Sequence, residues 1–466
     1  MNCYFLDPFG CVKNQVDAEN MMAHLNNAGW KCINDAEYAD LIIVNSCGFI
    51  ESAKQESINA VMNWRKLYPG KKILLAGCLS QRYAKELPDL LPEADGFFGV
   101  ENISQITDAA SDTVNAGSNA KKHKNTGIKA SAGNRPLLSL PGSAYVKISE
   151  GCNNRCSYCA IPLIRGNLVC RTIPDILNEC KILLSRGIRE LNIIGQDIAA
   201  FGTCNLPDKT MSLNTENINP AVFVSKLPEL LNAISLLEGH FWVRLLYLHP
   251  DHFPLEILDI IKQDKRFLPY FDIPFQHASP AILKAMNRNG NGKVYLELIN
   301  AIRKKLPDAV IRSAFLLGFP GETDDDFAAL LDFQKKAKLD WLGCFTFSRE
   351  EGTAAYSLKN RVPAKTALAR KKKIEENQIP ITEKNMECFT GLSMDVLIEE
   401  KIDPVAAANG EYSEPIWLGR LYCQAPDIDG AAVITGSGSY INNLQPGTFF
   451  KCKVIARRGF DLEVRV

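Results

Sequence analysis

The stretch that decides the fold reads Gly151-Cys152-Asn153-Asn154-Arg155-Cys156-Ser157-Tyr158-Cys159. It places three cysteines within eight residues, spaced as Cys-x-x-x-Cys-x-x-Cys. The stretch directly follows residues 144–148, whose composition favours a β-strand. A strand that opens into a loop is where a β/α barrel carries its chemistry. The pattern therefore predicts a central β/α barrel with three thiolates in its first loop.

Three thiolates in one loop can bind three of the four irons of a cubane iron–sulfur cluster. Cys170 lies 11 residues past Cys159 and is not counted as a ligand, which leaves one iron open for a substrate. Structural zinc is the alternative, with its fourth ligand supplied from elsewhere. Zinc sites favour paired Cys-x-x-Cys knuckles, and no partner pair accompanies this loop. The spacing therefore favours a cluster over zinc.

Strand and helix patterns alternate from residue 138 to 380 and predict the rest of the barrel. Further strand candidates lie at 191–194, 242–246, 271–273, 311–315 and 342–345. Six such units make a complete or partial barrel. Residues 202–220 are polar and irregular, which predicts a surface excursion. A charged helix from Lys365 to about Met386 follows the last strand.

Residues 1–112 predict a separate, doubly wound parallel α/β domain. Short apolar runs at 3–6, 41–44 and 73–76 alternate with helical patterns at 14–28 and 51–65. A continuous apolar run such as 41–44 is typical of a parallel strand that is buried on both faces.

A cysteine follows each of the three predicted strands of this first domain. These cysteines are Cys11, Cys47 and Cys78, with glycines nearby at 10, 48 and 77. Ligands of open parallel sheets bind outside the carboxyl ends of the strands, so we expect the three thiols to converge. Three unrelated buried thiols are the alternative, but the shared placement favours a second cluster with one open iron. A sulfide or thiolate could bind at that iron.

Two further regions complete the expected multidomain α/β organisation. Residues 113–137 are rich in Asn, Ser, Gly and Lys, which predicts a linker, and its basic run at 121–124 is interpreted as a solvated face. Residues 390–466 carry strand patterns at 394–398, 431–434 and 450–455, with Gly and Pro between them. This pattern predicts a small β-barrel at the C-terminus.

Composition limits the classes of function. Lys plus Arg and Asp plus Glu both number 53, so the net charge is zero. This balance argues against wrapping nucleic acid over a large surface, although a local basic patch stays open. The first residues show no signal peptide, and no apolar run reaches the ~18 residues of a membrane span. We therefore expect a cytoplasmic protein with no membrane partner, in which most of the 15 cysteines are thiols.

Together these features resemble the methylthiotransferase family of radical S-adenosylmethionine (SAM) enzymes over almost the whole chain. The resemblance covers the cysteine domain, the radical SAM core and a TRAM-type barrel at the C-terminus. The matching stretches are Gly10-Cys11-Val12-Lys13-Asn14-Gln15-Val16-Asp17-Ala18-Glu19, Cys47-Gly48-Phe49-Ile50-Glu51-Ser52-Ala53-Lys54, Ala160-Ile161-Pro162-Leu163-Ile164-Arg165-Gly166, Glu350-Glu351-Gly352-Thr353 and Gln424-Ala425-Pro426-Asp427-Ile428-Asp429-Gly430. They are closer to the branch that modifies ribosomal protein than to the branch that modifies tRNA. Two positions depart from the family pattern, because Cys170 stands where serine is usual and Ser46 where threonine is usual.

The resemblance implies an enzyme that converts C–H to C–S–CH3 with two [4Fe–4S] clusters and SAM. One SAM methylates sulfur, and a second yields a 5′-deoxyadenosyl radical. The implied ligands are Cys152, Cys156 and Cys159 for the radical cluster and Cys11, Cys47 and Cys78 for the sulfur-carrying cluster. The implied substrate is the β-carbon of an aspartate in small-subunit ribosomal protein S-twelve, and a flavodoxin or ferredoxin is an expected electron donor.

Two other functions stay open. The first is methylthiolation of a tRNA adenosine, and the second is a non-catalytic, metal-stabilised adaptor that binds ribosomes or RNA. Residues 395–466 hold ten acidic and seven basic residues, a net charge of −3. A mildly acidic barrel suits a basic ribosomal protein better than RNA, whose phosphates dominate affinity. The signal is weak, because a few local lysines could still bind RNA.

Other polar residues are expected to line the SAM site. Gly195 and Gln196 follow the second barrel strand at the family's SAM-contacting loop, although Asp197 there could simply cap a helix. Gln276 and His277 follow a later strand, and a lone histidine is more often structural. The glycines of 318–323 would permit close approach of adenosine or merely form a turn. Arg165 and Arg244 are candidate partners of a carboxylate of SAM or substrate, or of an internal acid.

Overall fold

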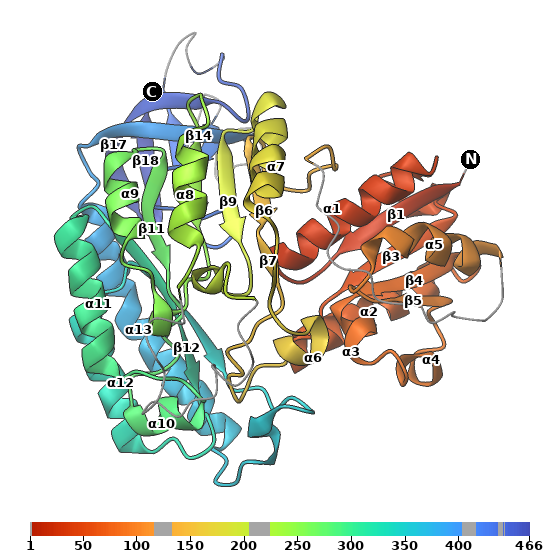
Figure 1. Cartoon of the computed structure of the whole chain (residues 1–466), viewed down its shortest axis with the longest axis horizontal. Coiled ribbons are helices and arrows are strands. Elements are labelled where there is room, and N and C mark those ends of the chain that lie inside the picture. Colours follow the sequence, from red (N-terminus) through yellow and green to blue (C-terminus); the bar gives the residue numbers. More distant parts are fainter. Residues whose placement is uncertain (1, 116–132, 205–223, 403–415, 437–440, 442) are drawn as a thin grey trace.

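The computed structural model describes residues 2–115, 133–204, 224–402, 416–436, 441 and 443–466. Most of the expected linker and of the 202–220 excursion lies outside the described residues. The chain forms an N-terminal α/β domain, a central sheet wrapped by helices, and a C-terminal barrel (Figure 1). Among the described helices, none combines the length and apolar character needed to cross a bilayer.

The N-terminal domain is built on a five-stranded parallel sheet, as the alternating pattern predicts. Its strands run in the order β2-β1-β3-β4-β5. They are β1 (Cys3–Pro8), β2 (Lys31–Cys32), β3 (Leu41–Ser46), β4 (Lys72–Gly77) and β5 (Gly96–Phe98). Every residue of β3 is buried, which explains its continuous apolar sequence. The strand order reverses between β1 and β3, and this switch point is where such sheets bind ligands.

Five helices cover the two faces of this sheet. They are α1 (Val12–Asn27), α2 (Glu51–Leu67), α3 (Cys78–Arg82), α4 (Leu87–Leu90) and α5 (Ile106–Asn115). α1 buries Val16, Met21 and Leu25 completely, so its apolar face follows the helical period read from the sequence.

The central domain is a six-stranded parallel sheet that does not close, and so is a partial barrel. Its order is β13-β12-β11-β10-β9-β6. The strands are β6 (Ser143–Lys147), β9 (Glu190–Ile194), β10 (Trp242–Leu245), β11 (Phe267–Asp272), β12 (Val310–Leu317) and β13 (Trp341–Thr346). Five of them lie within two residues of the expected bounds, whereas β11 begins four residues before the expected 271–273. A short antiparallel pair, β7 (Ser149–Glu150) with β8 (Val169–Cys170), extends beyond β6.

Helices pack on the outer face of the central sheet and bury one large apolar core. They are α7 (Ile173–Ser185), α8 (Leu227–Ser235), α9 (Ile257–Gln263), α10 (Pro280–Ala285), α11 (Gly292–Lys305), α12 (Asp324–Ala337) and α13 (Ala364–Glu387). The short helix α6 (Ile161–Arg165) lies apart from them and packs against α3 of the N-terminal domain. The charged helix expected from Lys365 corresponds to α13.

The C-terminal region is a closed five-stranded barrel, ordered β14-β15-β16-β18-β17. The strands are β14 (Ser393–Ile402), β15 (Ile416–Arg420), β16 (Ala432–Thr435), β17 (Phe449–Arg458) and β18 (Asp461–Arg465). β15 and β18 are absent from the sequence-based expectation, because each is only five residues long and contains a glycine or alternating charges.

The segment after β15 packs into the inner face of the central sheet and fills its amino-terminal end. Arg244 donates to the carbonyl of Tyr422, and the indole of Trp341 donates to the carbonyl of Cys423. The Tyr270 hydroxyl donates to Asp429 at 2.5 Å. The barrel thus blocks one end of the lumen, and the carboxyl ends of the strands are left to face the N-terminal domain.

Candidate active site

The three N-terminal cysteines lie at the switch point of the first sheet. Cys11 is the residue before α1, Cys47 follows β3, and Cys78 begins α3 directly after β4. A Cβ built on Gly10 would lie 3.2 Å from the Cβ of Cys47, and one on Gly48 would lie 2.7 Å from the carbonyl oxygen of Cys78. The glycines therefore let the three cysteine loops approach one another, as the strand-end placement predicts.

Asn14, which stands in the matching stretch 10–19, holds these loops together. Its amide donates to the carbonyl oxygens of Phe9 at 2.7 Å and Ser46 at 3.2 Å. Its carbonyl oxygen accepts from the Cys78 thiol at 3.7 Å. One buried side chain in the first turn of α1 thus ties the ends of β1, β3 and β4. Besides the matching stretch, the only signal in the sequence is its position three residues after Cys11.

The second trio occupies the loop between β7 and α6. Gly151 has φ 74°, and a Cβ there would lie 2.2 Å from the carbonyl oxygen of Asn167, so the turn requires glycine. Asn154 donates to Asp197 at 2.8 Å, and the backbone N–H of Ser157 donates to the carbonyl of Met286 at 3.0 Å. These bonds fix the loop that presents Cys152, Cys156 and Cys159 from two sides.

The segment Ala160–Arg165 directly follows Cys159 and contacts Cys78 of the N-terminal domain. Cys78 packs with Ala160 and Ile164 in one small apolar cluster. Arg165, at the end of α6, donates to the Cys78 sulfur at 3.1 Å. Because Ala160 directly follows Cys159, the short segment 160–165 connects the Cys152–Cys159 loop to the N-terminal cysteines.

The thiols fit a metal cluster by their chemistry. Burial raises the pKa of Cys78 and of Cys159 to about 12, so without metal both are protonated and poor nucleophiles. A metal would deprotonate them and supply the missing charge compensation. Among the described residues, no three His, Cys, Asp or Glu side chains lie close enough to bind one single ion. A cubane needs wider spacing, because each thiolate binds a different iron.

A buried layer of charge lies between the trios and the central sheet. Arg165 pairs with Asp17 at 2.8 Å and with Glu150 at 2.8 Å, and Lys147 pairs with the same two carboxylates. Arg165 and Lys147 hold the pKa of Glu150 well below its usual value, although burial opposes them. Arg165 already contacts two carboxylates and a thiol of the protein. Its expected contact with the carboxylate of SAM therefore stays a prediction.

Gly195 and Gln196 lie beside this charged layer. The Gln196 amide donates to Glu150 at 2.7 Å. Its carbonyl oxygen is buried without a hydrogen-bond partner, as is the hydroxyl of Ser149. A Cβ on Gly195 would lie 2.6 Å from that hydroxyl. An amine or hydroxyl of a ligand would satisfy these orphaned acceptors, so the residues present fit a molecule such as SAM.

Gln276 and His277 behave differently. Gln276 has φ 73°, a region that residues other than glycine occupy rarely and often at functional sites. His277 is fully buried, and burial lowers its pKa to about 4. Its Nδ1 accepts from the backbone of Ser279 at 3.0 Å. His277 is therefore neutral, and among the described residues its Nε2 is buried without a hydrogen-bond partner. The places of Gln276 and His277 in a SAM site stay predictions.

Asp197 and Arg244 are engaged within the protein. Asp197 accepts from Asn154 and lies 2.5 Å from His252. Arg244 pairs with Glu190 at 2.9 Å, which is the internal-acid alternative for this arginine. The Asp197 side chain also caps the short turn that follows β9, through the N–H of Ala199.

Glu350 clamps the N-terminal domain onto the central domain. It pairs with Arg82 at 2.7 Å and with Lys54 at 3.1 Å, and its side chain is 2% exposed. Burial raises the pKa of Glu350, but hydrogen bonds from Ser348, Arg82 and Lys54 outweigh burial and hold it low. One carboxylate therefore compensates two buried cations across the interface.

Glu350→Gln is expected to destabilise the protein by about 3–5 kcal/mol, because it leaves the buried Arg82 without its counter-charge and Lys54 with Glu51 alone. The measurement is urea denaturation followed by tryptophan fluorescence. Glu351→Gln is the matched control, since Glu351 is exposed and only its carbonyl accepts from Arg82. Equal denaturation midpoints for the two variants would show that the clamp contributes nothing.

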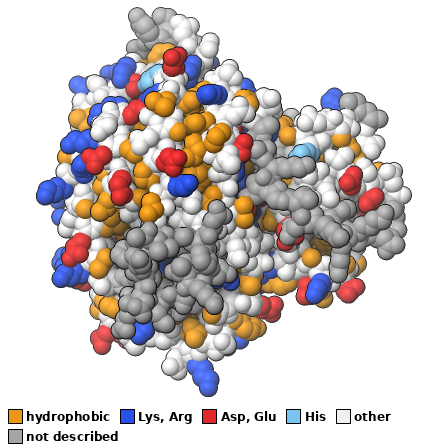
Figure 2. All heavy atoms as spheres, viewed as in Figure 1, with side chains coloured by type: hydrophobic (Ala, Val, Ile, Leu, Met, Phe, Trp, Pro, Cys, Tyr) orange, Lys and Arg blue, Asp and Glu red, His pale blue; other side chains and the backbone are white. Residues whose placement is uncertain are grey.

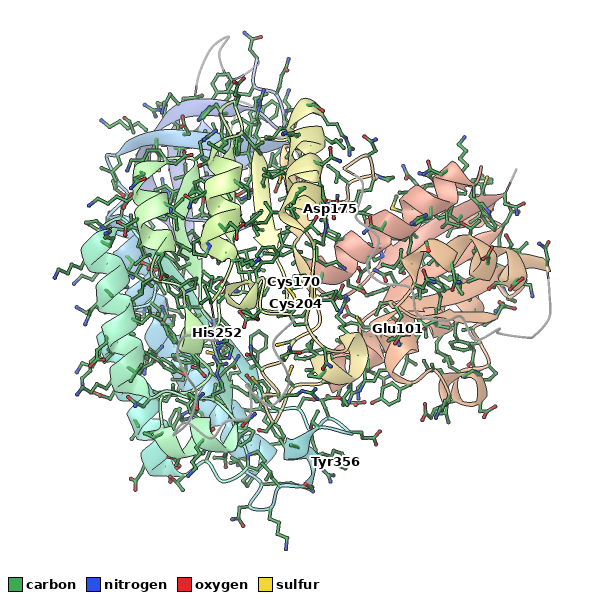
Figure 3. The ribbon with its side chains drawn as sticks, in the orientation of Figure 1. Glu101, Cys170, Asp175, Cys204, His252 and Tyr356 are labelled. Carbon is green, nitrogen blue, oxygen red and sulfur yellow. A yellow bond between two sulfur atoms is a disulfide. The ribbon has the colours of Figure 1, made fainter. Side chains whose placement is uncertain are left out.

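One disulfide joins Cys170 to Cys204 and ties β8 to the loop beyond β9 (Figure 3). The other 13 cysteines are free, in line with the expectation that most are thiols. Cys170 is therefore neither a cluster ligand nor a simple substitute for serine. Sequence spacing could not reveal this pairing, because its partner lies 34 residues away.

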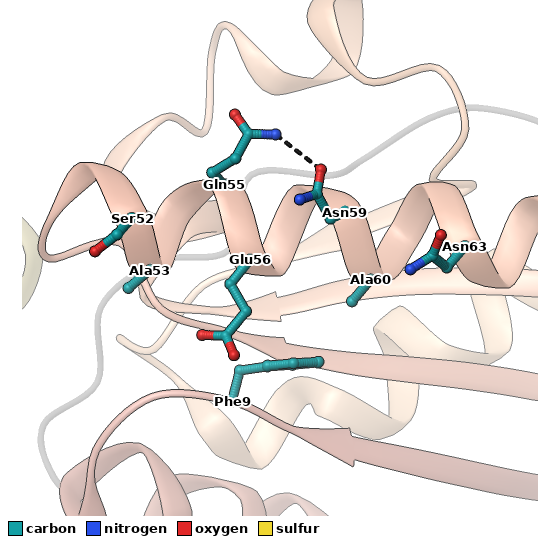
Figure 4. A pocket seen from close by; sticks show the side chains of 8 residues that line it. All are labelled: Phe9, Ser52, Ala53, Gln55, Glu56, Asn59, Ala60 and Asn63. Atoms are coloured by element: carbon teal, nitrogen blue, oxygen red, sulfur yellow. Dashed lines mark hydrogen bonds between the residues drawn. The ribbon is translucent and has the colours of Figure 1, made fainter.

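A shallow surface hollow runs along α2 and is separate from the cysteine trios. It is lined by Phe9, Ser52, Ala53, Gln55, Glu56, Asn59, Ala60 and Asn63. Figure 4 shows Glu56 directed toward the Phe9 ring, and Gln55 bonded to Asn59 on the same helix. No cysteine of either trio lines it, so the hollow is not the candidate active site.

Three family models match successive parts of the chain. Residues 3–99 match the uncharacterized protein family UPF0004, residues 146–333 match the radical SAM superfamily, and residues 390–466 match the TRAM domain. The three matches coincide with the three structural regions described above.

Curated relatives match over nearly the whole length. The chain is 46% identical to the ribosomal protein uS12 methylthiotransferase RimO of Treponema denticola, over 98% of this chain and 99% of that protein. It is 38% identical to the protein of the same name from Syntrophomonas wolfei, over 99% of each. Among solved structures, the fold is similar to the radical SAM methyltransferase TsrM from Kitasatospora setae. That likeness has a TM-score of 0.53 at 14% identity, over 76% of this chain and 74% of that chain.

Proposed function

The chain belongs to the RimO family of ribosomal protein uS12 methylthiotransferases, and from this premise we propose that it adds a methylthio group to the β-carbon of an aspartate in uS12. The observation that supports the proposal is the contact of Cys78 with Ala160, Ile164 and Arg165, in the segment that directly follows Cys159. Sulfur insertion needs both a radical source and a sulfur site at one reacting carbon, and this arrangement offers a place for each.

Cys152, Cys156 and Cys159 would hold one [4Fe–4S] cluster, and Cys11, Cys47 and Cys78 would hold the other. When bound, the clusters and SAM supply a carbon radical that removes hydrogen from an unactivated C–H bond and a position that holds sulfur. With three cysteines each, the two sites would leave one iron of each cluster without a cysteine ligand. Arg165 donates to Cys78 and balances the negative charge that metal binding would place on this sulfur.

Gly195, Gln196 and Gln276 would contact SAM in this proposal. The orphaned carbonyl oxygen of Gln196 supports a contact with an amine or hydroxyl of the ligand. Arg165 fits contact with the N-terminal cluster better than contact with the SAM carboxylate, since Asp17 and Glu150 already accept its charge.

The proposed chemistry needs partners besides uS12. An electron must reach the radical cluster from a low-potential carrier such as a flavodoxin or ferredoxin. Ribosomal protein is made and assembled in the cytoplasm, so the proposed reaction takes place there.

Charge favours ribosomal protein over tRNA as the substrate. Of the seven basic residues after residue 394, Arg420, Lys451, Arg457 and Arg458 are paired with carboxylates. Figure 2 shows acidic and basic side chains interspersed over the face in view. Among the described residues, three basic side chains of the barrel are left outside ion pairs and could neutralise phosphates: Lys401, Lys453 and Arg465.

The test is mass spectrometry of uS12 and of tRNA after incubation with the anaerobically reconstituted enzyme, SAM and a reductant. We expect one methylthio group in place of hydrogen on the uS12 aspartate, and none on tRNA. Modification of tRNA alone would overturn the assignment. Bound zinc without 5′-deoxyadenosine formation would instead favour a metal-stabilised adaptor.

A further inference from the structure

Lys13 is a buried lysine without a counter-ion, and burial lowers the pKa of its ammonium to about 7. It lies in the first turn of α1, two residues after Cys11, and is 7% exposed. Within the described part of the chain it makes no hydrogen bond, and no carboxylate lies within ion-pair distance. Its ammonium instead lies over the ring of Tyr247, 2.7 Å from the centroid. A cation–π contact recovers only part of the hydration that burial removes.

The other buried lysines do not share this state. Lys54 pairs with Glu51 and Glu350, and Lys147 pairs with Asp17 and Glu150. Buried charges in proteins are normally paired in this way. Lys13 can therefore bind one more anion, at the interface between the first and central domains.

The N-terminal thiols do not fill this role in the structure. The hydrogen bond to the Cys78 sulfur comes from Arg165, and among the described residues no sulfur lies within hydrogen-bonding distance of Lys13. Asp272, which faces Lys13 from β11, is paired with Arg312 at 3.2 Å and accepts from the backbone of Tyr247. Asp272 and Glu150, the two carboxylates that act on Lys13, are thus already compensated by other cations, whereas Cys11, two residues before Lys13, is a free thiol.

We propose that Lys13 binds the side-chain carboxylate of the substrate aspartate, an inference that rests on the proposed function. The carboxylate carbon of aspartate is bonded directly to the β-carbon that would react. A carboxylate held beside Cys11 therefore places the reacting carbon next to the N-terminal trio. Tyr247 supports this geometry, because its backbone has φ 70° and lies at the end of β10, where its ring faces Lys13.

Lys13 is less well placed for the carboxylate of SAM. The orphaned acceptors that fit SAM belong to Ser149 and Gln196, at the ends of β6 and β9. Lys13 belongs to the N-terminal domain and neighbours Cys11. Its ligand should therefore be the molecule that meets the sulfur, which is the protein substrate.

The experiment compares a uS12 peptide that contains the aspartate with the same peptide carrying asparagine, on reconstituted holoenzyme. The wild-type protein should bind the aspartate peptide about 10- to 100-fold more tightly, the range of a charge-assisted hydrogen bond. In Lys13→Gln this preference should fall to within about threefold. Lys13→Arg keeps the cation and should retain most of the preference.

Controls separate the possible causes of a change. Lys31→Gln, an exposed lysine of the same domain, should keep the wild-type preference. Iron content and the KM for SAM are measured on every variant. Loss of iron or a raised KM for SAM in Lys13→Gln, or an unchanged peptide preference, would overturn the role of Lys13. Failure of the wild-type enzyme to modify the aspartate peptide would instead overturn the proposed function.

Discussion

Cys47→Ala is expected to lower the rate of uS12 methylthiolation by at least ~1,000-fold, which corresponds to a rise of about 4 kcal/mol in the activation barrier. SAM should still be cleaved. Cys47 follows β3 and shares its site with Cys11 and Cys78 at the switch point of the first sheet. Its loss leaves two thiolates there, too few to hold a cubane, but does not touch the Cys152–Cys159 loop. Iron should fall from about eight to about four atoms per chain.

The measurement combines iron analysis, 5′-deoxyadenosine formation and mass spectrometry of uS12. Cys32→Ala is the matched control, because Cys32 is another free thiol of the same domain that lies on the edge strand β2. Methylthiolation that survived in Cys47→Ala would contradict the assignment of the N-terminal trio. Loss of SAM cleavage as well would show that the two trios do not act separately.

Cys156→Ala is expected to remove both SAM cleavage and methylthiolation, each by at least ~1,000-fold. Cys156 is the middle thiol of the loop fixed by Asn154, Ser157 and the Gly151 turn. Without it the radical cluster has two protein ligands, and iron should again fall to about four atoms per chain. The N-terminal site keeps its three thiolates but has no radical to use.

The readouts are reductant-dependent 5′-deoxyadenosine and the mass of uS12. Cys388→Ala serves as control, since Cys388 is exposed at the end of α13 and far along the chain from both trios. If Cys156→Ala still produced 5′-deoxyadenosine, the first loop would not be the site of SAM cleavage.

Much of this fold could be predicted from local sequence patterns. Continuous apolar runs marked β3 and β4, and alternation of strand and helix marked the central sheet. The cysteines were predictable for a physical reason, because parallel strands bring their carboxyl ends to one edge. Short elements such as β2, with two residues, carry too little pattern to be recognised.

The long-range part of the site could not be predicted in this way. Arg165 contacts Asp17, which lies 148 residues away in the sequence, and Cys78, which lies 87 residues away. It also contacts Glu150, 15 residues away. No local sequence pattern indicates these contacts. The same is true of the packing of residues 420–429 into the central sheet. In the sequence, Lys13 is only one residue of a stretch that matches the family. Its burial and its lack of an ion-pair partner depend on the tertiary structure.

Two clusters, each held by three cysteines, should be visible by anomalous diffraction at the iron edge from crystals of the anaerobically reconstituted protein. We expect two four-iron peaks, one within bonding distance of Cys11, Cys47 and Cys78 and the other within bonding distance of Cys152, Cys156 and Cys159. A single iron peak, or zinc at either trio, would contradict this expectation.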